Sequence, residues 1–287
     1  MSDSHNPLSS LLDFSGKTAL VAGVLDENSI GWPIAKMLND GGARVALSIQ
    51  RKAVRRMLGS VPEQLTNPLI LECDVSKDEE IERLFGQLGQ EFGHIDFLIH
   101  SVAYAPPQSF QNRFMDIQRA DFSLAMDVSA YSLIALAHGA FPLMKDRGGC
   151  ILAMTYYAGE KVVPGYQLMS ITKAALDNII RNLAYDLAPH RIRVNGLSPG
   201  PIATKAGTSI PGFEIMQNHM KEFAPLQEEI LNSDVGKTAL FLCSPLAEKI
   251  TGEIMGRVTF QNLAMGPAPS TSAASYRSVG TPCSPAK

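Results

Sequence analysis

The amino-acid sequence predicts a single doubly wound α/β domain, in which one parallel sheet carries helices on both faces. Short apolar segments typical of buried strands alternate along the chain with longer segments of helical periodicity. The first apolar segment leads through a turn at Gly23 into a helix, as at a dinucleotide-binding site. A later strand, which ends at Met154, leads into a long amphipathic helix that carries a tyrosine and a lysine seven residues apart.

The composition is that of an ordinary globular protein. The 287 residues, 45% of them hydrophobic and 18% charged, suffice for one large domain with a buried core. A net charge of -3 gives no basis for a nucleic-acid surface or a polybasic membrane anchor. No apolar segment approaches the roughly eighteen residues of a membrane helix, and residues 1–12 lack a secretion signal. The cysteines show no metal-ligand spacing. From the net charge and from the lack of a membrane segment or a secretion signal, we expect a cytoplasmic protein without a membrane or nucleic-acid partner.

The first strand is expected over residues 17–23 and the helix after it over residues 30–40. Asn28 and Ser29 have side chains that commonly cap a helix N-terminus. Such a terminus presents N–H groups and a positive dipole end to a pyrophosphate, and a glycine lets the backbone approach it closely. The segment therefore predicts a cofactor-binding turn, although an ordinary capped turn has the same pattern. The residues assigned to the cofactor are Gly23, Ser29 and Ile30.

The second strand is expected over residues 44–49, and Gln50 follows it where a dinucleotide enzyme contacts the adenosine ribose. No acidic residue stands there to accept the ribose hydroxyls and to repel a 2′-phosphate. Basic residues come next, which suits either NADPH or a solvated helix face: Arg51, Lys52, Arg55 and Arg56. The choice between NADH and NADPH therefore stays open.

Two further strands are expected, over residues 69–73 and 97–100. Ser76 and Glu79 form the pattern of a capping box for the helix between these strands. After the fourth strand, the small side chains of residues 101–105 allow the backbone to lie along a dinucleotide.

The second half of the chain continues the alternation. Residues 205–225 contain Gly, Thr and Pro without clear periodicity, which is typical of a mobile lid and equally of a surface loop. Ser233 and Asp234 are expected to cap a helix that ends near Cys243. Other helices are expected over residues 116–144 and 166–187, and strands over residues 150–154 and 191–197.

Tyr166 and Lys173 carry the strongest chemical signal in the chain. Seven residues at about 100° each return both side chains to one helix face. A phenol, with a free pKa of about 10, needs a neighbouring cation to release a proton near neutral pH, and a lysine two turns away can supply it. Tyr156, ten residues before Tyr166, lies on the loop that leaves the strand. A long helix can carry such a pair by chance. The strand that precedes the pair and the turn after the first strand of the chain favour the functional interpretation.

Together these residues resemble the short-chain dehydrogenase/reductase superfamily. The spacing Tyr-x9-Tyr-x6-Lys is similar to its divergent branch, the bacterial-type NAD(P)H-dependent enoyl-acyl-carrier-protein reductases. Ala153 stands where ordinary members have a Ser, and the run Asp-Val-Ser-Ala-Tyr-Ser at 127–132 replaces their Asn. The run His-Ser-Val-Ala-Tyr-Ala at 100–105 also matches the enoyl reductases. Within it, His100 is read as a packed strand-end residue rather than as a catalyst.

The resemblance implies a function and a set of site residues. It implies reduction of the trans-2 double bond of an enoyl thioester on acyl carrier protein, with NADH or NADPH, in the last reductive step of fatty-acid elongation. Tyr166 would stabilise the enolate, Lys173 would hold the nicotinamide ribose, and Tyr156 would shape the thioester end of the site. Gln50 resembles NADH-using members. The other implied cofactor contacts are Asp74 and Val75 beside the adenine, Ser101 and Val102 along the dinucleotide, and Ile202 and Thr204 on the nicotinamide side.

The C-terminal segment departs from the family pattern. The resemblance covers residues 12–254, after which the usual Val-Asp-Gly/Ser-Gly turn is missing. An edge strand, at the subunit contact of tetrameric relatives, can still form from Ile254, Val258 and Phe260. We therefore expect a homotetramer, a domain over residues 12–263, and a disordered tail over residues 264–287, which are rich in Pro, Ser, Ala and Thr.

Two other functions stay open. A short-chain reductase that acts on a ketone would use the same tyrosine and lysine, but Ala153 and the missing Asn near residue 127 argue against it. A non-catalytic dinucleotide-binding subunit would fit the altered C-terminus. The presence of Tyr156, Tyr166 and Lys173 argues against that alternative.

Overall fold

The computed structural model describes residues 9–50, 58–224 and 226–256. Within these ranges seven strands form one sheet in the order β3-β2-β1-β4-β5-β6-β7, and every neighbouring pair is parallel. The strand order reverses between β1 and β4, so the sheet is doubly wound and the predicted fold class is confirmed. The strands are β1 Thr18–Ala22, β2 Arg44–Ile49, β3 Leu69–Glu72, β4 Phe97–His100, β5 Gly149–Met154, β6 Ile192–Ser198 and β7 Ile254–Gly256.

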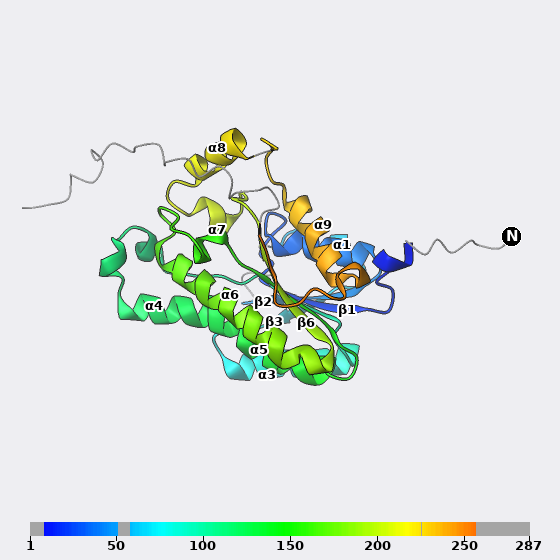
Figure 1. Ribbon diagram of the computed structural model, residues 1–287. Coiled ribbons are helices and arrows are strands. Elements are labelled where there is room, and N and C mark those ends of the chain that lie inside the picture. Colours follow the sequence, from blue (N-terminus) through cyan, green and yellow to red (C-terminus); the bar gives the residue numbers. More distant parts are fainter. Residues whose placement is uncertain (1–8, 51–57, 225, 257–287) are drawn as a thin grey trace, which may run out of the picture.

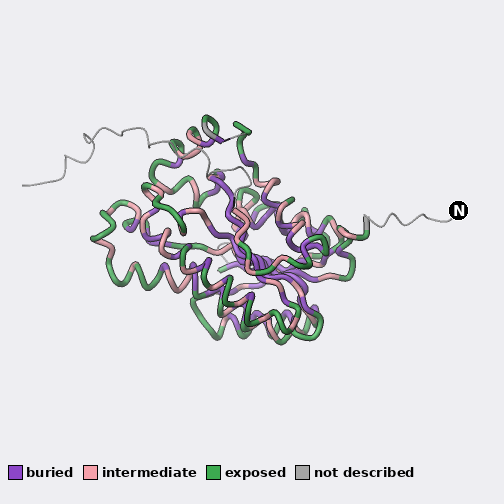
Figure 2. The backbone as a smooth tube through the Cα atoms, in the orientation of Figure 1, coloured by how far each residue is buried: buried purple, intermediate pink, exposed green. Residues whose placement is uncertain are grey.

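Helices cover both faces of the sheet (Figure 1). On one face α1 (Gly31–Asp40) packs against α9 (Asn232–Cys243), and the other face carries α3 (Asp78–Phe92), α5 (Ser132–Met144) and α6 (Gln167–Leu187). Each face has its own apolar core, and the buried strands between them form the continuous purple centre of Figure 2. Shorter described helices are α4 (Arg119–Met126), α7 (Lys205–Thr208) and α8 (Phe213–Phe223).

The start of α1 differs from the sequence prediction. The helix begins at Gly31, and no side chain caps it. The Ser29 hydroxyl instead accepts hydrogen bonds from the N–H groups of Leu25 and Asp26, at 2.9 and 3.1 Å. Ser29 therefore closes the loop between β1 and α1, and the first-turn N–H groups of α1 have no side-chain acceptor.

The predicted capping box of α3 is also wrong. The Ser76 hydroxyl donates to the Asp74 carboxylate at 2.7 Å, and Glu80 rather than Glu79 accepts the Asp74 N–H, also at 2.7 Å. Both acceptors therefore order the turn after β3 and not the first turn of α3. For α9 the expected cap is confirmed in part, because Asp234 accepts the N–H of Leu231 at 3.0 Å.

The helical stretch predicted over residues 116–144 is divided in the structure. A π-helical turn at Asp127–Tyr131 separates α4 from α5. By length and composition alone, Arg119–Met144 could cross a membrane, so the expectation that no segment approaches that length was wrong. Core helices of soluble proteins pass the same test. The inner face of α5 is buried against the sheet through Leu133, Leu136, Ala137, Ala140 and Met144.

Two segments left open by the sequence are ordered as helix and strand. Residues 205–225, expected as a lid or a loop, contain α7 and α8. The expected edge strand is present as β7, which pairs with β6. Val258 and Phe260, which were assigned to the same strand, lie outside the described residues, as do Arg51, Lys52, Arg55 and Arg56.

The carboxyl ends of β1 and β4 meet at a glycine. Gly23 has a φ of +97°, and a Cβ placed on it would lie 2.1 Å from the carbonyl oxygen of Ser101. The Ser101 N–H donates to the carbonyl of Ala22 at 2.9 Å, which holds the two strand ends together. Both the backbone conformation and the available space therefore require glycine at position 23.

Replacing Gly23 with Ala is expected to destabilise the fold by more than about 1 kcal/mol, because alanine is strained at positive φ and its methyl group would collide with backbone. Gly86→Ala is the matched control. It lies inside α3 with nothing within 4 Å of the added Cβ, so it should be neutral or stabilising. Urea unfolding of both variants measures the difference. A Gly23→Ala protein as stable as Gly86→Ala would contradict the proposed close contact.

Candidate active site

Lys173 is buried at the carboxyl end of β5. Its side chain is on α6, and its Nζ donates to the carbonyl oxygen of Met154 at 2.8 Å. Burial lowers the pKa of Lys173 to about 8, and the charge of Asp177 opposes this shift. Gly159 allows the loop after β5 to lie directly on α6, because a Cβ there would come within 2.9 Å of the backbone at Lys173 and Ala174. The ammonium is therefore held at a fixed place at the strand ends, with two of its three protons left for other acceptors.

Asp177 is a buried carboxylate one helical turn after Lys173. The Thr155 hydroxyl donates a hydrogen bond to it. Burial raises the pKa of Asp177, although Thr155 and the nearby cations favour the ionised form. Asp177 was not predicted as a site residue from the sequence. Asp177 is four residues after Lys173, a spacing that places both side chains on one helix face, and this spacing could have identified Asp177 from the sequence.

Tyr166 and Tyr156 lie beside each other. Their ring centroids are 4.8 Å apart with the ring planes tilted by 50°, and Tyr166 is buried. Burial raises the pKa of Tyr166 above its ordinary value, and the neighbouring Tyr156 raises it further. The charge of Lys173 is not among the causes of this shift, so the help of Lys173 in releasing a proton from this phenol stays a prediction. The raised pKa favours the neutral phenol, which can donate a hydrogen bond.

The backbone on both sides of Tyr166 has positive φ angles. Gly165 has φ +82° and Gln167 has φ +45°, so Tyr166 precedes the regular part of α6 instead of lying within it. A Cβ on Gly165 would lie 2.7 Å from the carbonyl oxygen of Pro211. A left-handed glutamine is uncommon and costs energy. The seven-residue spacing thus brings both side chains into the buried interior, but it does not reflect one continuous helix face.

The segment after β6 lies against these tyrosines. The Tyr156 hydroxyl donates to Sδ of Met216 in α8 at 3.9 Å. Thr204 accepts the N–H of Gly207 at 2.9 Å and caps α7, while Ile202 is buried in the core of the α1 and α9 face. The two residues predicted for the nicotinamide side are therefore structurally fixed at the end of β6.

The predicted adenosine-side residues meet at the ends of β2 and β3. The Gln50 carboxamide donates to the Asp74 carboxylate at 3.1 Å. Burial favours a higher pKa for Asp74, but hydrogen bonds from Ser76 and Gln50 lower it overall. Val75 is buried beside this pair. Gln50 and Asp74 thus form one polar cluster that the sequence did not predict as a pair.

The remaining predicted residues lie along the same edge of the sheet. Ser101 and Val102 are half-buried after β4, and Ile30 is packed against the core at the start of α1. His100 is fully buried, with Nε2 2.8 Å from the Ser132 hydroxyl, and burial followed by the charge of Lys173 lowers its pKa to about 3. The prediction that His100 is a packed residue is confirmed.

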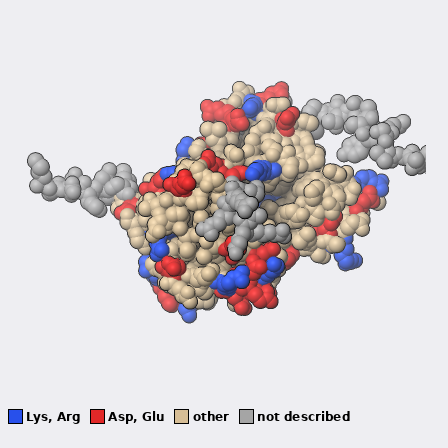
Figure 3. Space-filling view, turned by 180° about the vertical axis from the view of Figure 1, so that it is seen from behind, with Lys and Arg blue, Asp and Glu red and all other residues tan. Residues whose placement is uncertain are grey.

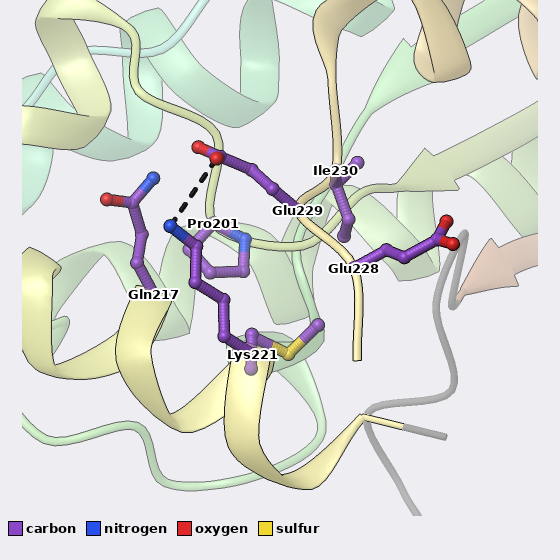
Figure 4. Close-up of a pocket in the computed structure, with 7 residues that line it drawn as sticks. Pro201, Gln217, Lys221, Glu228, Glu229 and Ile230 are labelled. Atoms are coloured by element: carbon purple, nitrogen blue, oxygen red, sulfur yellow. Dashed lines mark ion pairs between the residues drawn. The ribbon is translucent and has the colours of Figure 1, made fainter. Parts of the chain in front are cut away.

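Two hollows lie near these residues. A cavity of about 320 Å³ opens between the loop after β5, α6 and β7, and its lining includes Tyr156, Asp177 and Glu253. The second, of about 10 Å³, lies between α8 and the segment before α9, where Lys221 and Glu229 form an ion pair at 3.4 Å (Figure 4). A hollow of this size holds at most one water molecule. Only the first could receive part of a substrate.

The residues at this edge fit a dinucleotide. The N-terminus of α1 has neither a side-chain cap nor an acidic residue in its first turn, so its N–H groups and dipole are available to a pyrophosphate. Gln50 and Asp74 offer hydrogen-bonding groups at one end of the edge. Lys173 offers a buried cation toward the other end, where hydroxyl groups of a ribose could accept its protons.

Comparison with known proteins identifies the relatives of this chain. The sequence matches the family described as "Enoyl-(Acyl carrier protein) reductase" over residues 23–256. It is 42% identical over 240 residues to the enoyl-acyl-carrier-protein reductase (NADH) of Aquifex aeolicus. The aligned region covers 84% of this chain and 89% of the relative. It is 38% identical over 245 residues to the Staphylococcus aureus enzyme that is named for NADPH. This aligned region covers 85% of this chain and 95% of the relative.

Solved structures show the same similarity. The crystal structure of the Aquifex aeolicus enzyme has a TM-score of 0.82 to this chain at 42% identity, and the match covers 87% of this chain and 96% of that chain. The Bacillus cereus enzyme, crystallised with NADP+ and indole naphthyridinone, has a TM-score of 0.82 at 37% identity, covering 85% of this chain and 95% of that chain. The sheet and its helices are therefore arranged as in these enzymes.

The lowered pKa of Lys173 predicts a specific pH dependence of stability. Between pH about 8 and the ordinary lysine value of 10.5, the unfolded chain binds a proton that the folded chain has lost. The contribution of Lys173 to the free energy of unfolding therefore rises with pH across this window. Below about pH 8 the lysine is charged in the folded protein, and the full cost of burying its ammonium is present. The free energy of unfolding of the parent protein, relative to Lys173→Met, should increase from pH 8 to pH 10.

Urea unfolding of both proteins over this range measures the effect. Lys237→Met is the control, because Lys237 is an exposed residue in a surface ion pair with Asp234. A flat difference between the parent and Lys173→Met, like that expected for the control, would contradict the burial of the ammonium.

Proposed function

Since the chain belongs to the enoyl-(acyl carrier protein) reductase family, we propose that it reduces the trans-2 double bond of an enoyl thioester carried on acyl carrier protein, the final reductive step of fatty-acid elongation. The observation that carries the assignment of its site is the contact between the tilted rings of Tyr156 and Tyr166, together with the buried Lys173 on α6. Tyr156 lines the larger cavity, its ring contacts that of the buried Tyr166, and Lys173 is buried on α6. In the proposed function the hydroxyl of Tyr166 faces the thioester.

Tyr166 acts by hydrogen bonding to developing charge. A reduced nicotinamide, when bound, would supply hydride to C3 of the enoyl chain; negative charge would develop on the thioester oxygen as an enolate, and a proton from water added at C2 would complete the reduction. A phenol that remains protonated can donate its O–H to that oxygen. The raised pKa of Tyr166 keeps the donor in place across the physiological range. This interaction is stronger in the transition state than in the ground state, and such interactions accelerate the chemical step.

Lys173 binds and orients the cofactor. One of its protons is donated to the carbonyl of Met154, which fixes the direction of the ammonium, and the other two would be donated to hydroxyl groups of the nicotinamide ribose. Thr155 and Asp177 hold α6 against β5 around this point. Tyr156 positions the thioester end of the substrate, and Met216 against its hydroxyl brings α8 over the acyl chain.

Both nicotinamide dinucleotides are candidates. Relatives of this chain are named for NADH and for NADPH, so the family does not separate them. In our proposal Gln50 and Asp74 hold the adenosine end, Ser29 and Ile30 border the pyrophosphate, and the loops at Ser101 and Thr204 border the rest. Turnover with a crotonyl or longer enoyl thioester, measured with NADH and with NADPH, tests both the reaction and the choice.

The same assay excludes or supports the alternatives. Faster turnover of a ketoacyl thioester than of the enoyl thioester would favour a ketone reductase. Dinucleotide binding without any turnover would favour a non-catalytic subunit. Family membership and Ala153 in place of a serine support the enoyl substrate.

We further propose a cytoplasmic homotetramer. Several large apolar side chains on α4, the π-helical turn, α5 and α6 are exposed: Phe122, Leu124, Tyr131, Ile134 and Tyr185. Such a surface is typical of a subunit contact. Among the described residues on the face shown in Figure 3, Lys and Arg lie among Asp and Glu instead of gathering in one patch. Mass measurement in solution tests the assembly.

Tyr166→Phe should reduce turnover by about a hundredfold, because loss of one oxyanion donor costs about 3 kcal/mol at comparable sites. Its dinucleotide affinity should stay close to that of the parent, since the lost interaction forms only in the transition state. Tyr185→Phe, at an 86% exposed position on the same helix, is the control and should be unchanged. Parental turnover by the Tyr166 variant would remove this residue from the mechanism.

Lys173→Met should weaken dinucleotide binding by about tenfold or more, because hydrogen bonds from a charged donor are among the stronger ones. Fluorescence titration with NADH gives the dissociation constant, and circular dichroism checks that the variant is folded. Unchanged affinity in a folded variant would count against the assigned ribose contact.

A further inference from the structure

An ion pair joins two loops at the carboxyl edge of the sheet. Asp26 lies in the loop between β1 and α1, and Lys205 is the first residue of α7, which follows β6. Nζ of Lys205 is 2.8 Å from Oδ2 of Asp26. In the sheet β4 and β5 lie between β1 and β6, so the two strands are three spacings of about 4.8 Å apart, or about 14 Å. The ion pair therefore spans the ends of two intervening strands.

Both ends of this ion pair are held in place. The Asp26 carboxylate is only 16% exposed and also accepts the N–H of Asn28 at 2.9 Å, within the loop closed by Ser29. Lys205 is 57% exposed, but its backbone is fixed where Thr204 caps α7. An ion pair with one half-buried partner and two anchored backbones loses less entropy on forming than one between free side chains. Lys221 and Glu229, both about half exposed, are an example of the weaker kind.

The same loop is tied to the far end of the segment that includes α7 and α8. Nδ2 of Asn232, the first residue of α9, donates to the carbonyl oxygen of Asn28 at 3.0 Å. Residues 205–231 are thus attached to the loop after β1 at both of their ends. This segment also carries Met216, which contacts the Tyr156 hydroxyl. The loop that borders the pyrophosphate site therefore anchors the segment that borders the reacting groups.

The crevice beneath the ion pair is where a doubly wound sheet binds its ligand. The strand order reverses between β1 and β4, and ligands of such sheets lie at this switch point, outside the carboxyl ends of the strands. In the proposed function the pyrophosphate lies at the N-terminus of α1 and the nicotinamide lies toward Ile202 and Thr204. A dinucleotide in this position extends from the loop that carries Asp26 to the loop that carries Lys205.

We propose that Asp26 and Lys205 form a clasp across the bound dinucleotide and slow its dissociation. The proposal rests on the proposed function, because it requires a dinucleotide in this crevice. Neither side chain contacts the reacting atoms in this account, so both are positioning residues. The clasp holds α7 against the loop after β1, and opening it frees the dinucleotide to leave.

Stopped-flow measurement of NADH dissociation from the full chain tests the clasp. Lys205→Met and Asp26→Asn should each speed dissociation by about fivefold, as expected for a partly buried ion pair. The double variant should dissociate no faster than either single variant, because all three lack the same interaction. Lys205→Arg should restore slow dissociation, and Lys221→Met should match the parent. The KM for NADH should rise in the Met and Asn variants while the turnover number at saturation is not lowered.

Several results would overturn the proposal. If Lys205 instead contacts the pyrophosphate directly, Asp26→Asn would leave dissociation unchanged or slow it, because removing the carboxylate releases the lysine for the phosphate. Additive effects in the double variant, or equal acceleration by Lys221→Met, would also contradict a specific pair. A parent protein that binds no dinucleotide would overturn both the clasp and the proposed function. A parent that binds it but is insensitive to these substitutions would overturn the clasp alone.

Discussion

The buried ammonium of Lys173 is the constraint on which the arrangement of the site depends. A charge removed from water is costly unless it is hydrogen-bonded, and here the carbonyl of Met154 accepts one of its protons. That contact fixes α6 relative to the end of β5. Thr155 and Asp177 add a second contact between the same strand end and the same helix, and Gly159 allows the loop between them to lie close. The two tyrosines are placed by the loop that these contacts hold.

This arrangement separates the chemical roles of the two groups. Burial lowers the pKa of the lysine and raises the pKa of the tyrosine, so both shifts disfavour charge in the interior. The raised pKa therefore favours a neutral tyrosine that can donate a hydrogen bond, and in the proposed function the lysine binds the cofactor instead of ionising the phenol. Stabilisation of an enolate needs a donor with its proton in place, which agrees with the enoyl reductase family to which the chain belongs.

Patterns within one segment were predictable from the sequence, and contacts between distant segments were not. The bounds of β2 and β4 agree with the apolar runs, because buried parallel strands are nearly continuous hydrophobic segments. The helix caps at Ser29 and Ser76 were wrong because each hydroxyl has a second polar partner nearby that periodicity does not reveal. The spacing of Tyr166 and Lys173 indicated the candidate site, and the roles of these residues stay predictions. By contrast, Asp26 and Lys205 are joined only by the folding of the sheet, so no local pattern indicated them.

The protonation state of Tyr166 tests this account most directly. Tyrosine labelled with 13C at Cζ reports ionisation by its chemical shift, and the spectrum of Tyr166→Phe assigns the signal. We expect the Tyr166 resonance to remain that of a neutral phenol up to and beyond the ordinary tyrosine pKa of about 10. A Tyr166 signal that titrates below pH 10 would show that the nearby lysine does ionise the phenol, and would contradict the account.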